Sequence, residues 1–132
     1  MPFSLKLPLI CAIALVPRLA AADPSLECSL SNGSQIEIGA CVADAEATVE
    51  KTLALALGFA TDSAKSLDEA TGRPMATPAL EAGQAAWTAY RDAHCDFVGS
   101  TFGGGSGTGI AIQSCRVELG RARIAELLSY AR

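Results

Sequence analysis

Two cysteines on either side of a glycine-rich segment constrain the fold of this chain more than any other feature. Cys95 ends a run of residues with helical character, and Cys115 lies twenty positions further on. Five of the ten residues from Ser100 to Gly109 are glycine, a composition that favours a flexible turn over a helix. A disulfide between the two cysteines would staple two antiparallel helices, with Trp87, the only tryptophan, packed between them.

The beginning of the chain has the pattern of a secretory signal peptide. A short segment with one lysine precedes an apolar run at residues 7–16, and Ala20 and Ala22 form an A-x-A cleavage pattern. The run is too short to cross a bilayer, which needs roughly 20 apolar residues. We therefore predict that residues 1–22 are removed after Ala22. The mature domain, residues 23–132, would be periplasmic or secreted, with no stable membrane span.

Removal of this segment takes Cys11 with it and leaves an even number of cysteines. The four that remain are Cys28, Cys41, Cys95 and Cys115. In a small exported chain, this count indicates two disulfides and not metal ligands or a thiol nucleophile. Three pairings are possible, and the sequence order favours Cys28 with Cys41 and Cys95 with Cys115, because each pair brackets one local turn. Closing a loop of such length stabilises a fold by roughly 3 kcal/mol.

The charge of the predicted mature chain is negative and unevenly distributed. Eight basic residues stand against fourteen acidic ones, which gives a net charge near −6. Residues 23–70 carry a net charge of −7, and residues 71–132 carry +1. Nucleic-acid binding needs a basic face to neutralise phosphates, so this balance argues against it. A cationic protein is the partner that the charge favours.

The first long helix has clear start and stop signals. Ser34 and Glu37 form a capping box, and Gly72 suits a C-terminal cap. Between them, apolar residues recur at spacings of three and four, as on one face of a helix. The predicted apolar face consists of Val42, Ala45, Val49, Leu53, Ala56, Leu57, Ala60, Ala64 and Leu67. We expect residues 23–33 to form an extended or looped arm and Gly39 to break the first turn.

Two further helices follow. Thr77 is the predicted N-cap of the second, with Pro78 at its first position and its end near Val98. The residues along one side of this helix are Leu80, Trp87, Tyr90, His94 and Phe97. The third is expected to begin near Ile110. Its main face comprises Ile110, Val117, Ile124, Leu127, Leu128 and Ala131. With no strand-like alternation, the sequence predicts an all-α fold: a small antiparallel bundle of three main helices stapled by two disulfides.

No set of residues predicts catalysis, a cofactor or a metal site. His94 has Asp92, Cys95 and Asp96 as near neighbours, but adjacent residues of a helix do not converge on one point. The glycine-rich loop has no lysine and lacks the spacing of a phosphate-binding loop. Ser106 does not fit a nucleophile elbow, because the position two residues later is threonine. The chain is therefore predicted not to be an enzyme.

The second half of the chain carries a family likeness. The stretch QAAWTAYRDAHC, the glycine-serine loop and SCRVELGRARIAEL together resemble the C-terminal half of the LprI-like lysozyme-inhibitor domain, which is a small exported bacterial domain. The matching positions are Gln84, Trp87, Arg91, Asp92, Cys95, Gly104, Gly105, Ser106, Cys115, Arg116, Leu119, Arg123, Glu126 and Leu127. Glu27-Cys28 and SQIEIGAC, ending at Cys41, are similar to its N-terminal half, with Phe59 in place of a central tyrosine.

The resemblance implies a compact, all-helical, disulfide-linked domain outside the cytoplasm. It favours a non-enzymatic inhibitor of lysozyme-type peptidoglycan hydrolases; the alternative is a periplasmic protein-binding or envelope-maintenance module without lysozyme inhibition. We expect a mainly structural role for the motif residues Gln84, Trp87, Arg91, Asp92, Arg116 and Arg123. A lysozyme cleft presents two carboxylates, so a loop entering it should offer hydrogen-bond donors and little bulk. The predicted contact loop consists of Ser100, Thr101, Gly104, Gly105, Ser106 and Thr108.

Overall fold

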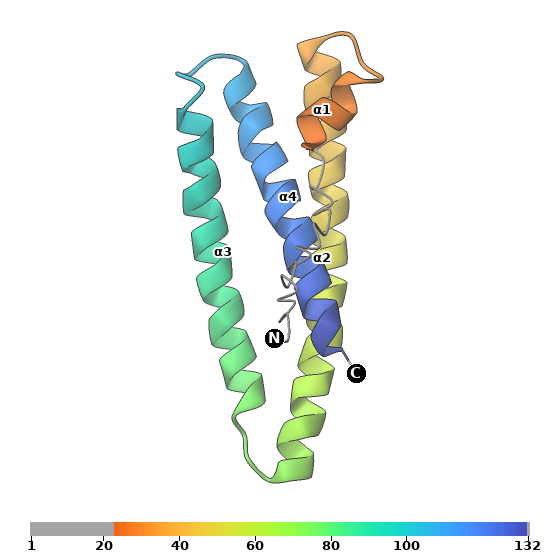
Figure 1. Ribbon diagram of the computed structural model, residues 1–132, viewed down its shortest axis with the longest axis vertical. Helices are drawn as coiled ribbons and strands as arrows, with labels where there is room; N and C mark the ends of the chain where they lie inside the picture. Colours follow the sequence, from red (N-terminus) through yellow and green to blue (C-terminus); the bar gives the residue numbers. More distant parts are fainter. Residues whose placement is uncertain (1–22, 132) are drawn as a thin grey trace, which may run out of the picture.

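A computed structural model of the protein describes residues 23–131, so the predicted signal peptide lies outside the described residues. The helices are α1 (Pro24–Ser29), α2 (Gln35–Thr71), α3 (Ala76–Ser100) and α4 (Gly107–Tyr130). As Figure 1 shows, α2 and α3 form a long antiparallel hairpin, and α4 returns antiparallel to α3. The described part contains no strand. The predicted all-α bundle of three main helices is confirmed, and the short α1 is an addition to it.

The start of the chain corrects the expectation of an extended or looped arm. Asp23 is the N-cap of α1, where its carboxylate accepts a hydrogen bond from the backbone N–H of Ser25 at 2.9 Å. Pro24 occupies the first helical position and is buried. An Asp-Pro pair is itself a helix-start signal, and so short a helix becomes stable only through tertiary contacts. The disulfide between Cys28 and Cys41 supplies such a contact by joining α1 to α2.

Helix α2 begins and ends where the sequence predicts. The Ser34 hydroxyl accepts a hydrogen bond from the backbone N–H of Glu37, and the Glu37 carboxylate accepts one from the backbone N–H of Ser34. Gly72 has a φ of 64°, the left-handed conformation that glycine adopts readily at a helix end. The predicted break at Gly39 is wrong. A single glycine inside a helix costs only about 1 kcal/mol, and Gly39 lies against the side chain of Ile110.

Helix α3 begins at Ala76, so the predicted N-cap at Thr77 is wrong. The cap comes instead from Asp68, in the last turns of α2. Its carboxylate accepts hydrogen bonds from the backbone N–H groups of Met75, Ala76 and Thr77, at 3.0, 2.8 and 3.0 Å. These bonds, that from Thr77 above all, lower the pKa of Asp68 to about 2. Pro78 still lies in the first turn, where no backbone N–H is needed within the helix.

Helix α4 begins at Gly107, three residues before the predicted start at Ile110. The loop between α3 and α4 is therefore residues 101–106. Within it, Gly103 and Gly104 have φ values of 65° and 78°, in the region that side-chain-bearing residues rarely adopt. The predicted disulfide between Cys95 and Cys115 closes this end of the bundle, with 5.5 Å between the two Cα atoms.

The hydrophobic core lies where α2, α3 and α4 meet. Leu53, Ala56 and Ala60 of α2 pack with Leu127 of α4, whose side chain is completely buried. Four residues of the predicted helix faces are exposed: Leu67, Tyr90, Phe97 and Leu128. Leu67 is exposed because α4 ends before it reaches the last turns of α2 (Figure 1). Phe97 lies two positions, and hence about 200° around α3, from the buried Cys95.

Two glycines allow α4 to approach its neighbours closely. Gly120 lies against Val49 of α2, and a Cβ at this position would overlap the Val49 Cγ1 atom. Gly99 of α3 lies in the same way against Ile112 of α4. Both glycines are buried. The contacts at these two points place α4 tightly against both other long helices.

Candidate functional site

Six residues, Gln84, Trp87, Arg91, Asp92, Arg116 and Arg123, lie together along the α3–α4 interface, and we call them the arginine seam. The Arg123 guanidinium donates a hydrogen bond to Gln84 at 3.0 Å and lies over the Trp87 ring, 5.9 Å from its centroid. On the same ring, the Arg91 guanidinium lies 5.1 Å from the centroid. The residues are thus connected through one aromatic ring that contacts two cations.

The remaining members of the seam continue this chain of contacts. The Nε atom of Arg91 donates a hydrogen bond to Asp92 at 3.1 Å. The Nε atom of Arg116 lies 3.9 Å from the same Asp92 oxygen, which is an ion-pair distance but too long for a hydrogen bond. This Nε is buried and has no hydrogen-bond partner in the described residues. Every member of the seam therefore contacts another member.

Helix α2 contributes two carboxylates to the seam. The Arg91 Nη1 atom donates a hydrogen bond of 2.6 Å to Glu50, and the Arg116 Nη1 atom lies 3.5 Å from Glu46. The two glutamates are one helical turn apart and so lie on one side of α2. The sequence showed an acidic first helix but not which of its carboxylates face the arginines. Spacing within one helix carries no information on the rotation of a neighbouring helix.

The exposure of the seam limits what it can bind. The side chains of Arg91 and Arg123 are only 12% and 10% exposed, whereas Glu50 and Asp92 are 45% and 46% exposed. Pairs that are this open to water each contribute at most about 1 kcal/mol. The buried guanidinium groups use their donors on residues of α2, α3 and α4. This geometry fastens three helices together.

A different region, the predicted contact loop, is only partly a loop. Ser100 is the last residue of α3, and Thr108 lies in the first turn of α4. The hydroxyls of Ser100 and Thr101 donate to backbone carbonyls of α3, at 2.6 and 2.7 Å. The Thr108 hydroxyl is buried and has no partner in the described residues. The exposed tip consists of Gly104, Gly105 and Ser106, and Figure 1 places it at one end of the bundle.

The groups nearest to His94 do not assemble into a reactive centre. The His94 ring stacks on Tyr90, with the ring centroids 5.4 Å apart. Cys95 is bonded to Cys115 and is buried, so it presents no free thiol. In residues 23–131, no group of three or more histidine, cysteine, aspartate or glutamate side chains is arranged to hold a metal ion.

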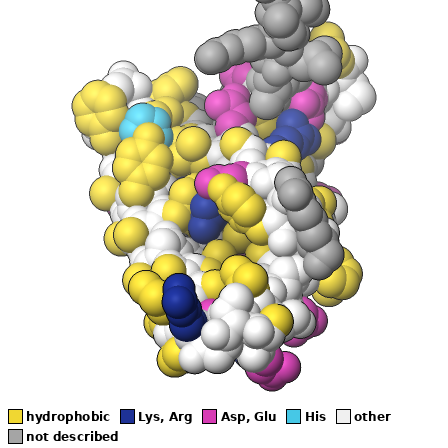
Figure 2. All heavy atoms as spheres, turned by 60° about the horizontal axis from the view of Figure 1, so that its bottom comes forward, with side chains coloured by type: hydrophobic (Ala, Val, Ile, Leu, Met, Phe, Trp, Pro, Cys, Tyr) yellow, Lys and Arg dark blue, Asp and Glu magenta, His cyan; other side chains and the backbone are white. Residues whose placement is uncertain are grey.

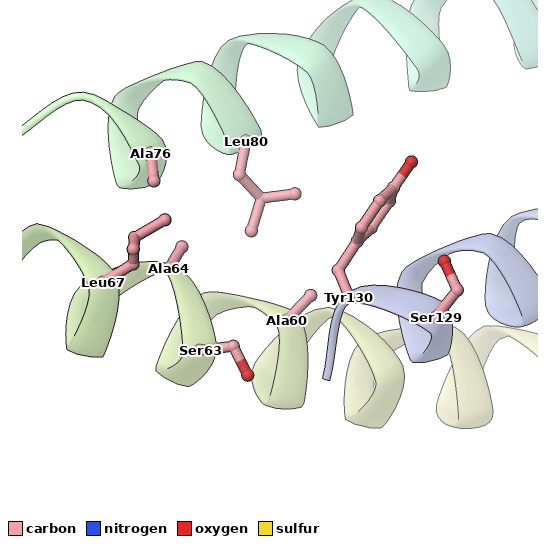
Figure 3. Close-up of a pocket in the computed structure, with 8 residues that line it drawn as sticks. All are labelled: Ala60, Ser63, Ala64, Leu67, Ala76, Leu80, Ser129 and Tyr130. Atoms are coloured by element: carbon pink, nitrogen blue, oxygen red, sulfur yellow. The ribbon is translucent and has the colours of Figure 1, made fainter. Parts of the chain in front are cut away.

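A groove of about 540 Å³ lies at the opposite end of the bundle from the loop. Figure 3 shows Leu80 of α3 and Tyr130 of α4 projecting into the space beside α2. The other lining residues are Ala60, Ser63, Ala64, Leu67, Ala76 and Ser129. The groove exists because α4 ends at Tyr130 while the α2–α3 hairpin continues. Its walls, as formed by the described residues, are mainly apolar and contain no carboxylate, histidine or lysine.

Across the described residues, no helix combines the length and apolarity needed to span a lipid bilayer.

Comparisons with known proteins give one family match and one relative. A family model described as "Lysozyme inhibitor LprI" matches residues 27–127, a range that contains both disulfides and the seam. An uncharacterized protein of Rhizobium meliloti (strain 1021) is 34% identical over 113 residues, which cover 81% of this chain and 80% of the relative. No solved structure matches the chain significantly.

Proposed function

Because this chain belongs to the LprI lysozyme inhibitor family, we propose that it is an exported protein that binds a lysozyme-type peptidoglycan hydrolase and inhibits it. In this proposal the protein acts by occupying its partner and catalyses no reaction of its own. Family membership is the observation that carries the proposal. The two disulfides are compatible with the oxidising compartments outside the cytoplasm, where such hydrolases act.

We propose the loop tip, Gly104, Gly105 and Ser106, as the part of the protein that approaches the catalytic cleft of the hydrolase. The tip is exposed, and no side chain larger than serine stands at these three positions. The Cys95–Cys115 disulfide and the α3–α4 contact at Gly99 hold both ends of the loop. A loop held in this way loses less conformational entropy on binding than a free segment would. Backbone N–H groups at the tip would serve as donors to the carboxylates of the cleft.

The negative charge of the protein would assist the encounter with a basic hydrolase. Residues 23–70 carry nine acidic and two basic side chains. Opposite net charges steer two proteins together and raise the association rate, an effect that weakens as the salt concentration rises. Charge alone would attract any cationic protein. The loop and its geometry would therefore have to supply the selectivity for a hydrolase.

The direct test is an inhibition assay. The purified protein is added to several lysozyme types, and lysis of bacterial cell walls is followed with time. We expect saturable inhibition of at least one type. A basic protein without hydrolase activity serves as a binding control. If no lysozyme is inhibited at tens of micromolar, the proposal is wrong, and a protein-binding or envelope-maintenance role takes its place.

A pair of glycine variants tests the role of the loop. Gly105→Glu places a carboxylate at the tip, where the backbone allows a side chain and where the cleft carboxylates would repel it. Gly83→Glu introduces the same charge on an exposed part of α3 with open space around it. We expect the first variant to weaken inhibition by about tenfold or more and the second to leave it near the wild-type value. Equal inhibition by both variants would exclude the loop tip from the contact.

A further inference from the structure

A strip of aromatic side chains lies exposed near the loop. Tyr90, His94 and Phe97 follow one another along α3; the His94 ring is 5.4 Å from that of Tyr90 and 6.5 Å from that of Phe97. Tyr90 is 55% exposed and Phe97 is 64% exposed. Phe102, in the loop, is also exposed and lines a small pocket together with His94. We call these four residues the aromatic strip. In Figure 2 the histidine, in cyan, has hydrophobic side chains on both sides.

The pocket beside the strip has acidic walls. Its volume is about 190 Å³, below the range of roughly 300–1,000 Å³ that is usual for small-molecule sites, so its size suits a single side chain. Asp23, at the N-cap of α1, and Glu118 of α4 contribute carboxylates to the lining. Among residues 23–131, no lysine or arginine lines the pocket. The nearby Arg121 makes two hydrogen bonds to Glu27, with both guanidinium NH₂ groups.

The Glu118 carboxyl of the pocket is partly buried and lies near the negative charge of Asp23. Burial, followed by the negative charge of Asp23, raises the pKa of the Glu118 carboxyl above its ordinary value. The positive charge of Arg121 opposes this shift but does not cancel it. A positive group placed between the two carboxylates would relieve their repulsion, because opposite charges at short distance favour the ionised form.

A separate observation at the same pocket is an unpaired hydroxyl. Ser114 lines the pocket, is only 6% exposed, and its hydroxyl has no hydrogen-bond partner among the described residues. Other helical hydroxyls, such as those of Thr88 and Ser100, donate to carbonyls of their own helix. Leaving a buried polar group unpaired is unfavourable, so a change that gave this hydroxyl a partner would be favoured.

We infer that the pocket and the aromatic strip form a docking surface for a basic protein, with one lysine or arginine side chain of the partner in the pocket. Asp23 and Glu118 pair with the cation in the pocket that Ser114 also lines. The exposed rings of Tyr90, Phe97 and Phe102 provide the flat surfaces on which further cationic or apolar groups stack. This inference rests on the proposed function, because it names the surface through which a cationic hydrolase is held while the loop tip enters the cleft.

Two variants and two matched controls test the surface with a basic lysozyme as the probe. Glu118→Gln removes one pocket charge, and Phe97→Ala removes one exposed ring of the strip. The controls are Glu69→Gln, at the far end of α2, and Phe59→Ala, whose side chain is 56% exposed on α2. Calorimetric titration should show that each surface variant raises the dissociation constant at least about fivefold, whereas the controls stay within about twofold. Equal affinities in all four variants overturn the inference, even if inhibition persists.

A second probe separates this inference from the proposed function. Amide signals of the labelled protein are followed by NMR during titration with acetyl-glycyl-arginyl-glycine amide, and with the same peptide carrying neutral citrulline. The inference predicts shifts around His94, Phe102 and Glu118 with the arginine peptide only, and their loss in Glu118→Gln. If these shifts occur although no lysozyme binds, the pocket stands and the proposed function fails. Identical responses to both peptides, or none at these residues, overturn the inference.

Discussion

Gly120→Ala tests the close packing of α4 on α2, and Gly58→Ala is its matched control. Both glycines lie inside long helices, where alanine is favoured over glycine by about 1 kcal/mol. A Cβ at Gly58 meets nothing within 4 Å, so this variant should be about 1 kcal/mol more stable than the wild type. A Cβ at Gly120 would overlap Cγ1 of Val49, a β-branched side chain with little rotamer freedom.

Overpacking of a core costs typically about 1–3 kcal/mol. After the helical gain of about 1 kcal/mol is subtracted, Gly120→Ala should be about 0–2 kcal/mol less stable than the wild type. The two alanine variants should then differ by about 1–3 kcal/mol. Urea unfolding, followed by circular dichroism with both disulfides intact, measures this difference if the denaturant slope is unchanged. Equal stabilisation by the two substitutions would refute the close approach of α2 and α4.

A double-mutant cycle assigns the cost to one contact. Val49 is buried, so Val49→Ala alone should destabilise the protein by leaving a gap between α2 and α4. In Gly120→Ala, the same change removes the atom that the new methyl group would overlap. The double variant should therefore be more stable than the sum of the single changes, by about 0.5–3 kcal/mol. If the free-energy changes of the two single variants simply add, the destabilisation by Gly120→Ala does not arise from its contact with Val49.

Three further predictions concern the other contacts that hold the bundle. Replacing Cys95 and Cys115 by serine opens a loop with a sequence separation of 20, so the free energy of unfolding should fall by about 3 kcal/mol. The urea midpoint should therefore be lower than that of the wild type, and an unchanged midpoint would contradict this prediction. Asp68 has its pKa lowered from 3.8 to about 2, so its stabilising effect is present above pH 3.8 and is lost as the pH falls toward 2. Asp68→Ala should therefore be less stable than the wild type at neutral pH, and this difference should shrink over that acidic window; a pH-independent difference would refute the capping role. Arg91→Ala should lower the stability by roughly 1–2 kcal/mol, measured by thermal unfolding. Arg91→Lys keeps the charge but loses the guanidinium contact with Trp87 and the fixed fork of donors, so its stability should lie between those of Arg91→Ala and the wild type.

Local chemistry explains why much of the fold could be predicted. The Ser34–Glu37 capping box and the glycine at position 72 act through backbone groups within a few residues of themselves. The disulfide pairs also agree with the sequence order, because each closes a short segment. Where local signals compete, prediction is less secure. The start of α3 was misplaced because its cap, Asp68, lies eight residues before Ala76 on a different helix.

The candidate site, like the fold, could be predicted only in part from the sequence. The sequence identified the residues of the arginine seam by their resemblance to a family motif and singled out the glycine-rich loop. It could not show that Trp87 contacts two guanidinium groups, because Arg91 and Arg123 belong to different helices. Nor could it show that Tyr90 and Phe97 face outward, since an apolar stripe does not reveal which part of it a neighbour covers. The acidic pocket was not predicted, because its walls come from α1, α3 and α4.

The sequence by itself indicated the three long helices, the favoured pairing of the cysteines and the family, since capping, periodicity and motif spacing are properties of short segments. Tertiary structure alone decided which faces are covered. The rotation of each helix about its axis depends on close contacts such as Gly120 with Val49, and the length of α4 relative to α2 leaves Leu67 open. Those two quantities arise only when helices pack, and they determine which carboxylates, rings and loop residues this protein presents to a partner.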